Sequence, residues 1–269
     1  MTSVESGFAD VNGTRLYYET AGAGVPVVLI HGLGLDARTW DAQVDELASR
    51  YRVVRYDLRG FGRSAPAGDE PFRHADDLEA LLAFLGVDSA HVVGFSMGGR
   101  IALVHALLHP ERPRSLVLAD AALDAFDWSD EWNDSFRALF ARGAEAGPDA
   151  ANALWIEHPL FAVARVRREI AAPLERMIRE SPGRFWVDKV RERGIKPPAA
   201  QRLHELRVPA LVIVGEHDVE DFRRVARRLA AEIPNARFRE IAGAGHMTVL
   251  ERPDAFTEAL LTFFAETDA

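Results

Sequence analysis

The sequence predicts an α/β protein in which helices flank a mostly parallel sheet and a separate helical segment is inserted late in the chain. Three observations predict this class: short unbroken apolar runs, amphipathic patterns between them, and one long stretch without strand-like runs. Unbroken apolar runs are typical of strands buried on both faces of a parallel sheet. Their alternation with helical patterns predicts consecutive βαβ units.

The elements follow in order along the chain. Strands at residues 7–11 and 16–20 are joined by Asn12-Gly13, a pair typical of tight hairpin turns. The later strands are expected at residues 25–30, 52–57, 91–95, 115–119, 210–215 and 237–241. Apolar residues at three- and four-residue spacing indicate helices, which we expect at residues 39–49, 75–85, 100–108, 221–233 and 254–266.

The stretch at residues 121–200 shows no strand and predicts several helices. We therefore expect a core domain formed by residues 1–120 and 201–269, with residues 121–200 as a helical cap, or lid, before the seventh strand. An insertion at the carboxyl edge of a parallel sheet lies over the crevice that binds ligands. Some cap aromatics form the core of the helical layer, and others face the crevice. The candidates for substrate binding are Trp128, Trp132, Trp155, Phe161 and Trp186.

Composition limits the partners and the chemistry. A formal charge of −9 opposes attraction to nucleic acid or to anionic membranes, so we expect neither partner. The absence of cysteine excludes a cysteine nucleophile and cysteine-ligated metal. The first residues lack the pattern of a secretory signal, and no apolar stretch could span a bilayer, so we expect a soluble, cytoplasmic protein. The sequence carries no signal for oligomeric state.

A Gly-Phe-Ser-Met-Gly-Gly segment at residues 94–99 follows one strand and precedes a helix. This context is typical of a nucleophile elbow, in which a strained turn holds the serine hydroxyl out of the strand. Crowding of the backbone requires Gly94 and Gly98, and the helix N-terminus favours negative charge. The alternative is a glycine-rich turn with a capping serine, but the flanking elements favour Ser96 as nucleophile.

A His-Gly-Leu-Gly segment at residues 31–34 directly follows another predicted strand. Acyl transfer needs hydrogen-bond donors at the carbonyl oxygen that becomes negative. The candidates for this oxyanion hole are the backbone N–H groups of Leu33 and Met97. We expect His31 to fix its loop by hydrogen bonds rather than to act as a base.

The candidate base and its orienting acid also lie at strand ends. His246 sits on a glycine-rich loop after residues 237–241, and Asp218 follows residues 210–215. An aspartate that accepts a hydrogen bond from the imidazole fixes its tautomer. Asp120 is a rival acid and Glu216 a weaker one. Asp57 is expected to hold the loop at residues 59–64.

These segments, taken in order with residues 56–64, resemble the α/β-hydrolase superfamily, in its small esterase, enol-lactonase and cofactor-free perhydrolase branch. The resemblance implies an eight-stranded sheet, a helical lid, and neither cofactor nor metal. It also implies a small-molecule ester or lactone substrate, cleaved by acyl transfer through Ser96, His246 and Asp218. The alternatives are carbon–carbon bond hydrolysis and a non-catalytic ligand-binding receptor. Relatives often carry a proline soon after the acid, whereas Asp218 is followed by residues 219–222 without one.

Overall fold

The computed structural model describes residues 3–188 and 191–268. Its centre is an eight-stranded sheet in the order β1-β2-β4-β3-β5-β6-β7-β8. The strands are β1 (Val4–Val11), β2 (Thr14–Ala21), β3 (Pro26–Ile30), β4 (Arg52–Tyr56), β5 (Ala90–Phe95), β6 (Pro113–Ala119), β7 (Ala210–Gly215) and β8 (Ala236–Ile241). The pairs that join β4, β3, β5, β6, β7 and β8 are parallel, whereas β1 pairs with β2, and β2 with β4, in antiparallel fashion. The predicted α/β class and mostly parallel sheet are confirmed.

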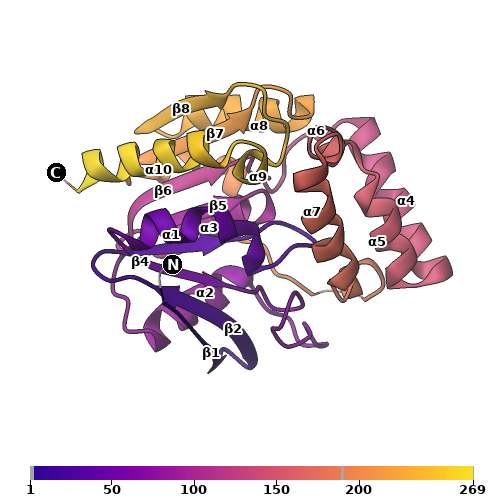
Figure 1. The fold of residues 1–269 in the computed structure, drawn as a ribbon, viewed down its shortest axis with the longest axis horizontal. Helices are drawn as coiled ribbons and strands as arrows, with labels where there is room; N and C mark the ends of the chain where they lie inside the picture. Colours follow the sequence, from indigo (N-terminus) through magenta and orange to yellow (C-terminus); the bar gives the residue numbers. More distant parts are fainter. Residues whose placement is uncertain (1–2, 189–190, 269) are drawn as a thin grey trace.

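Helices cover both faces of this sheet (Figure 1). The helices outside the segment between β6 and β7 are α1 (Asp41–Ala48), α2 (His74–Phe84), α3 (Met97–Leu108), α8 (Glu220–Glu232), α9 (Thr248–Glu251) and α10 (Pro253–Thr267), with a 3₁₀ helix at Ala37–Trp40 before α1. Val28 and Ile30 of β3 belong to a buried cluster shared with α2, α3 and α8. Val27 and Leu29 belong to a second cluster shared with α1 and α10. Side chains that alternate along one strand thus supply the cores of two layers.

The hairpin between β1 and β2 turns where the sequence predicts. Asn12 and Gly13 both adopt positive φ angles, of 46° and 69°. Two successive residues in this region match the right-handed twist of the flanking strands. The Asn-Gly pair therefore sets the register in which Val11 faces Thr14.

The expectation that the last strand is buried on both faces is wrong. β8 lies at the edge of the sheet with one neighbouring strand, β7. Its residues 237–240 are exposed, and Phe238 keeps 46% of its surface in solvent. An edge strand that carries charged side chains resists pairing with another chain, which explains its polar sequence.

Residues 120–209 join β6 to β7, and we call them the helical insertion. They contain α4 (Asp130–Ala146), α5 (Pro148–Ile156), α6 (Ala162–Arg165) and α7 (Arg168–Glu180), with 3₁₀ helices at Pro159–Phe161, Arg184–Trp186, Ala199–Gln201 and Leu203–Glu205. Figure 1 shows α4 to α7 gathered at one end of the sheet. No strand of the sheet comes from the described part of this insertion, as predicted. No helix in the described ranges is long and apolar enough to cross a membrane.

Candidate active site

Ser96 occupies a strained turn between β5 and α3. Its φ and ψ angles are 54° and −115°, in a region that non-glycine residues rarely adopt. A side chain at Gly94 would overlap the carbonyl oxygen of Gly98, and one at Gly98 would overlap that of Ile30. Both glycines are therefore required for the turn, as the motif predicted. The turn presents Ser96 at the first residues of α3.

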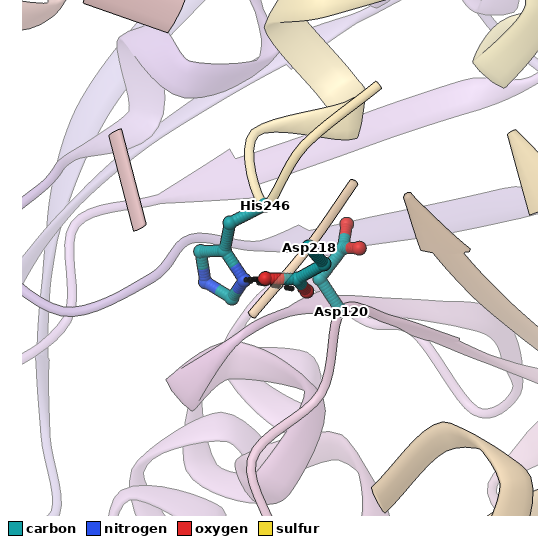
Figure 2. A group of neighbouring side chains, drawn as sticks. All are labelled: Asp120, Asp218 and His246. Atoms are coloured by element: carbon teal, nitrogen blue, oxygen red, sulfur yellow. Dashed lines mark hydrogen bonds and ion pairs between the residues drawn. The ribbon is translucent and has the colours of Figure 1, made fainter. Parts of the chain in front are cut away.

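Ser96, His246 and Asp218, which follow β5, β8 and β7, form a chain of hydrogen bonds at the carboxyl edge of the sheet. The Ser96 Oγ lies 3.1 Å from His246 Nε2. His246 Nδ1 lies 2.9 Å and 3.1 Å from the two carboxylate oxygens of Asp218 (Figure 2). A carboxylate only accepts, so Nδ1 donates and Nε2 is left as an acceptor for the serine O–H. This arrangement can remove the proton from a hydroxyl as it attacks an electrophile.

Packing and glycines hold the His246 ring in place. The rings of Phe222 and Phe95 lie 4.3 Å and 5.3 Å from it, measured between centroids. A side chain at Gly215 would overlap the carbonyl oxygen of Gly245. The close approach of these two strand-end loops brings Asp218, which is buried, to the imidazole. The sheet thus brings Ser96 and His246 together, although they lie far apart in the sequence.

Asp120 lies beside Asp218 but makes different bonds (Figure 2). It accepts a hydrogen bond of 3.0 Å from the Gly215 N–H and a short one from the Thr248 hydroxyl. Burial, reinforced by the negative charge of Asp218, raises the pKa of Asp120 well above its usual range. Of the two strand-end acids, only Asp218 is hydrogen-bonded to the imidazole.

Asp120, Asp218 and His246 are also the one group in the described residues whose donor atoms are close enough to hold a cation, within 4.8 Å of one another. Their polar atoms already form hydrogen bonds with one another, with backbone N–H groups, or with the side chains of Thr248 and Ser96. A cation there would have to break the bond between His246 and Asp218.

The other strand-end polar residues have structural partners. His31 accepts the Leu58 N–H at Nε2 over 2.9 Å and donates from Nδ1 to the Gly32 carbonyl over 2.8 Å. Desolvation lowers the pKa of His31, which favours the neutral ring. Asp57 accepts the N–H groups of Ala37 and Arg63 at 2.8 Å and 2.7 Å, as expected for a residue that holds the following loop.

Glu216, the weaker rival acid, is exposed and accepts the Gly243 N–H over 2.8 Å. It does not reach the imidazole.

Leu33 and Met97, the candidates for the oxyanion hole, line the same cavity as Ser96. Within the described residues, neither backbone N–H is paired with a backbone carbonyl. A Cβ atom at Gly32 would lie 3.3 Å from the Ser96 Cβ, so the two loops approach closely. Two free amides therefore border the space in front of the serine.

This cavity has a volume of about 310 Å³, and six of its fifteen described lining residues are aromatic. Three of the predicted substrate-binding residues, Trp128, Trp132 and Trp155, line it. Phe161 and Trp186 do not; both are buried behind Trp155, with ring centroids 5.1 Å and 5.4 Å from it. The expectation that these two rings face a ligand is corrected, because they form the interior of the helical insertion.

Sequence reasoning missed other parts of the wall. Phe136, Phe185 and Phe222 line the cavity as well. Phe136 stands four residues after Trp132 on α4, so the helical period could have placed both on one face. Phe222 lies on α8, outside the helical insertion, and had no such signal.

Charged residues line one part of the cavity. Arg100 forms ion pairs with Glu192 at 2.7 Å and with Asp124 at 3.3 Å. Within the helical insertion, Arg165 instead pairs with Glu157 at 2.7 Å, and Arg168 is exposed. Arg100 had a sequence signal, since it stands in the first turn of the helix that follows Ser96.

Comparisons with known proteins agree with this fold. Residues 25–253 match a family described as the alpha/beta hydrolase fold. The chain is 35% identical over 270 residues to the "Putative carbamate hydrolase RutD" of Azorhizobium caulinodans, covering 97% of this chain and 99% of the relative. It is 29% identical to a pimeloyl-[acyl-carrier protein] methyl ester esterase of Pectobacterium atrosepticum, covering 92% of this chain and 98% of the relative.

Solved structures extend the likeness. A thermophilic esterase from Thermogutta terrifontis superposes with a TM-score of 0.84 at 28% identity, covering 98% of this chain and 100% of the other. An enol-lactonase from Burkholderia xenovorans LB400 gives a TM-score of 0.82 at 28% identity, covering 96% and 100%. A hydrolase of Paraburkholderia phymatum named for 2-hydroxy-6-oxononadienedioate and its trienedioate is 30% identical, covering 94% of this chain and 91% of the relative.

Proposed function

Because the chain belongs to the α/β-hydrolase fold family, we propose that it is a serine hydrolase that cleaves carboxylic esters, lactones and enol-lactones included. The observation that carries the proposal is the hydrogen-bond chain from Ser96 through His246 to Asp218. Ser96 also lines a cavity whose aromatic rings suit an apolar acyl or aryl group. The substrate is a small molecule.

In the proposed mechanism, the Ser96 oxygen attacks the ester carbonyl while His246 Nε2 takes the hydroxyl proton. The N–H groups of Leu33 and Met97 stabilise the oxyanion of the tetrahedral intermediate. His246 then protonates the departing alcohol, which leaves an acyl group on Ser96. Water attacks this acyl-enzyme as His246 takes its proton, and the acid is released when that proton returns to Ser96.

We further propose that residues 121–200 act as a lid over a core formed by residues 1–120 and 201–269. The aromatic residues Trp128, Trp132 and Trp155 would then hold the substrate from above the nucleophile. Their position in the cavity wall supports this role.

Two alternatives start from the same site. The first is carbon–carbon bond hydrolysis, which the likeness to the relative named for a dioate substrate supports. Against it, a dioate carries two carboxylates, whereas the charged residues of this cavity are two acids and one base. A ligand-binding receptor without turnover would not need the complete hydrogen-bond chain from Ser96 to Asp218.

A covalent label and one variant test the proposal. We expect a fluorophosphonate probe to label Ser96, and Ser96→Ala to lower turnover of p-nitrophenyl hexanoate by about 10⁴-fold or more. Ser49→Ala, at an exposed serine that follows α1, is the matched control and should leave turnover unchanged. Near wild-type turnover by Ser96→Ala would refute the assignment of the nucleophile. Tight ligand binding without any turnover would favour the receptor.

A further inference from the structure

The cavity in front of Ser96 has two chemically different parts. Aromatic rings from α4, α5 and α8 line one part of it, together with Trp128 and Phe185. Only three of its lining residues in the described chain are charged: Arg100, Asp124 and Glu192. We call these three residues the charged end of the cavity.

The charged end lies close to the reacting centre. Ser96 precedes α3 as its N-cap, its carbonyl accepts the Arg100 N–H over 3.2 Å, and both residues line the cavity. With a rise of about 1.5 Å per residue, the backbones of these positions are about 6 Å apart along the axis. A substrate group several bonds from the scissile carbonyl can therefore reach this end.

The two carboxylates already neutralise the arginine. Glu192 Oε2 lies 2.7 Å from Arg100 Nη2, and Asp124 Oδ1 lies 3.3 Å from Nη1. All three side chains are largely buried, with exposed fractions of 17% for Arg100, 30% for Asp124 and 19% for Glu192. One guanidinium and two carboxylates leave a formal charge of −1.

The second oxygen of each carboxylate is available to a ligand. Across the described residues, neither Asp124 Oδ2 nor Glu192 Oε1 takes part in a hydrogen bond. Glu192 is also held in position, because its backbone forms an isolated parallel bridge with Phe72 of the core. The charged end thus offers fixed acceptors rather than a free cation.

We propose that the charged end selects substrates that carry a hydrogen-bond donor, best an ammonium group, about four to six bonds from the scissile carbonyl, and rejects those with a carboxylate there. This inference rests on the proposed serine hydrolase and specifies its substrate class. The donor binds the free carboxylate oxygens, while a carboxylate meets two like charges and an arginine that is already paired. Asp124 and Glu192 are specificity-determining residues in this account.

A different role for the same three residues makes a different prediction. Arg100 lies on α3, whereas Asp124 and Glu192 belong to the helical insertion, so the ion pairs also join the two parts of the molecule. If they served only as a structural clamp, their removal would lower the melting temperature and leave the preference among substrates unchanged.

The test compares p-nitrophenyl esters of equal length that differ at the chain end: hexanoate, 6-aminohexanoate and the monoester of hexanedioate. Acetate esters of butan-1-ol, 4-aminobutan-1-ol and 4-hydroxybutanoate test the leaving-group side, because four carbons place the chain end at the same number of bonds from the carbonyl carbon as in the acyl series. We expect kcat/KM for the amino ester to exceed that for the carboxylate ester by about tenfold or more on at least one side.

Neutral variants then test the residues. Glu192→Gln and Asp124→Asn should each reduce the preference for the amino ester, and the double variant should reverse it, because Arg100 then faces the carboxylate unpaired. Glu131→Gln is the matched control, since this exposed residue lines a neighbouring cavity that shares Trp132 with this one. It changes the net charge equally and should leave the preference unaltered.

The two proposals fail separately. If the hexanoate ester is not hydrolysed in a Ser96-dependent way, the proposed function fails. If it is hydrolysed, but the amino ester is not preferred on either side, or the neutral variants lower only the melting temperature, the inference on the charged end is overturned.

Discussion

The carboxyl ends of the strands and the helical insertion contribute to the same cavity by different physical means. At the strand ends, Ser96, Asp218 and His246 are held by glycine-dependent backbone turns and hydrogen bonds of 2.9–3.1 Å. In the helical insertion, neighbouring aromatic rings pack with centroid separations such as 4.7 Å for Trp128 and Trp132 and 5.9 Å for Phe136 and Trp155. Directional bonds fix atoms for chemistry, whereas ring packing tolerates changes of shape and so can adapt to different substrates.

The two regions also differ in how many partners each side chain contacts. At the strand ends, His246 is bonded to Ser96 through Nε2 and to Asp218 through Nδ1, so the loss of any one of the three residues breaks the chain. In the helical insertion, Trp132 contacts the rings of Trp128, Phe136, His158 and Phe222. We therefore expect substitutions at the strand ends to abolish turnover and those in the insertion to change preference or stability.

The largest expected effect is the difference in kcat between variants of the two buried aspartates, Asp218 and Asp120. Asp218→Asn removes the acceptor that orients His246 Nδ1, and we expect kcat to fall by about 10⁴-fold. Asp120→Asn should lower kcat less than tenfold, because Asp120 is not bonded to His246 and burial already favours its neutral form. Steady-state kinetics on one ester measures both variants. An equal loss in Asp120→Asn would show that the acid function is shared.

A smaller effect should separate two aromatic residues of the helical insertion. Phe161 is buried behind the wall, so Phe161→Ala should lower the unfolding free energy of the protein by about 3–5 kcal/mol and retain the preference for acyl length. Trp132→Ala opens the wall itself, so it should raise KM for short esters by about tenfold and shift the preference to longer ones. Chemical denaturation and a chain-length series measure the pair. An altered preference in Phe161→Ala would contradict the division between wall and interior.

The smallest effect concerns pH and stability. Burial, reinforced by His246, lowers the pKa of His158 in the helical insertion to about 4. The unfolded chain takes up this proton near pH 6.5, so between these values it binds more protons than the native state. The unfolding free energy should therefore decrease as the pH falls through this window. Burial also lowers the pKa of His105 in α3 to about 4, which adds a contribution of the same sign.

His158→Gln should reduce the loss of melting temperature between pH 7 and pH 5 without removing it, because His105 remains. His204→Gln, at an exposed position, is the control. If His158→Gln leaves this pH dependence unchanged, the histidine is not buried in its neutral form as described.

Local patterns in the sequence determined the order of the strands and helices, the Asn12-Gly13 turn, and the strand-end positions of Ser96, Asp218 and His246. Each of these features can be recognised from adjacent residues, because a strained turn needs glycine and a buried strand needs an apolar run. The exposure of β8 was not predicted, because the order of strands in the sheet decides which strand lies at the edge, and a single strand's sequence does not give that order.

Only the tertiary structure decided between Asp218 and Asp120 as the partner of His246, placed Phe161 and Trp186 behind the cavity wall, and paired Arg100 with Asp124 and Glu192. These outcomes join residues far apart in the chain, such as Arg100 and Glu192. The residues next to them in the sequence do not indicate the contact. The free energy of burial and ion pairing depends on which surfaces meet in the fold and not on local backbone preference.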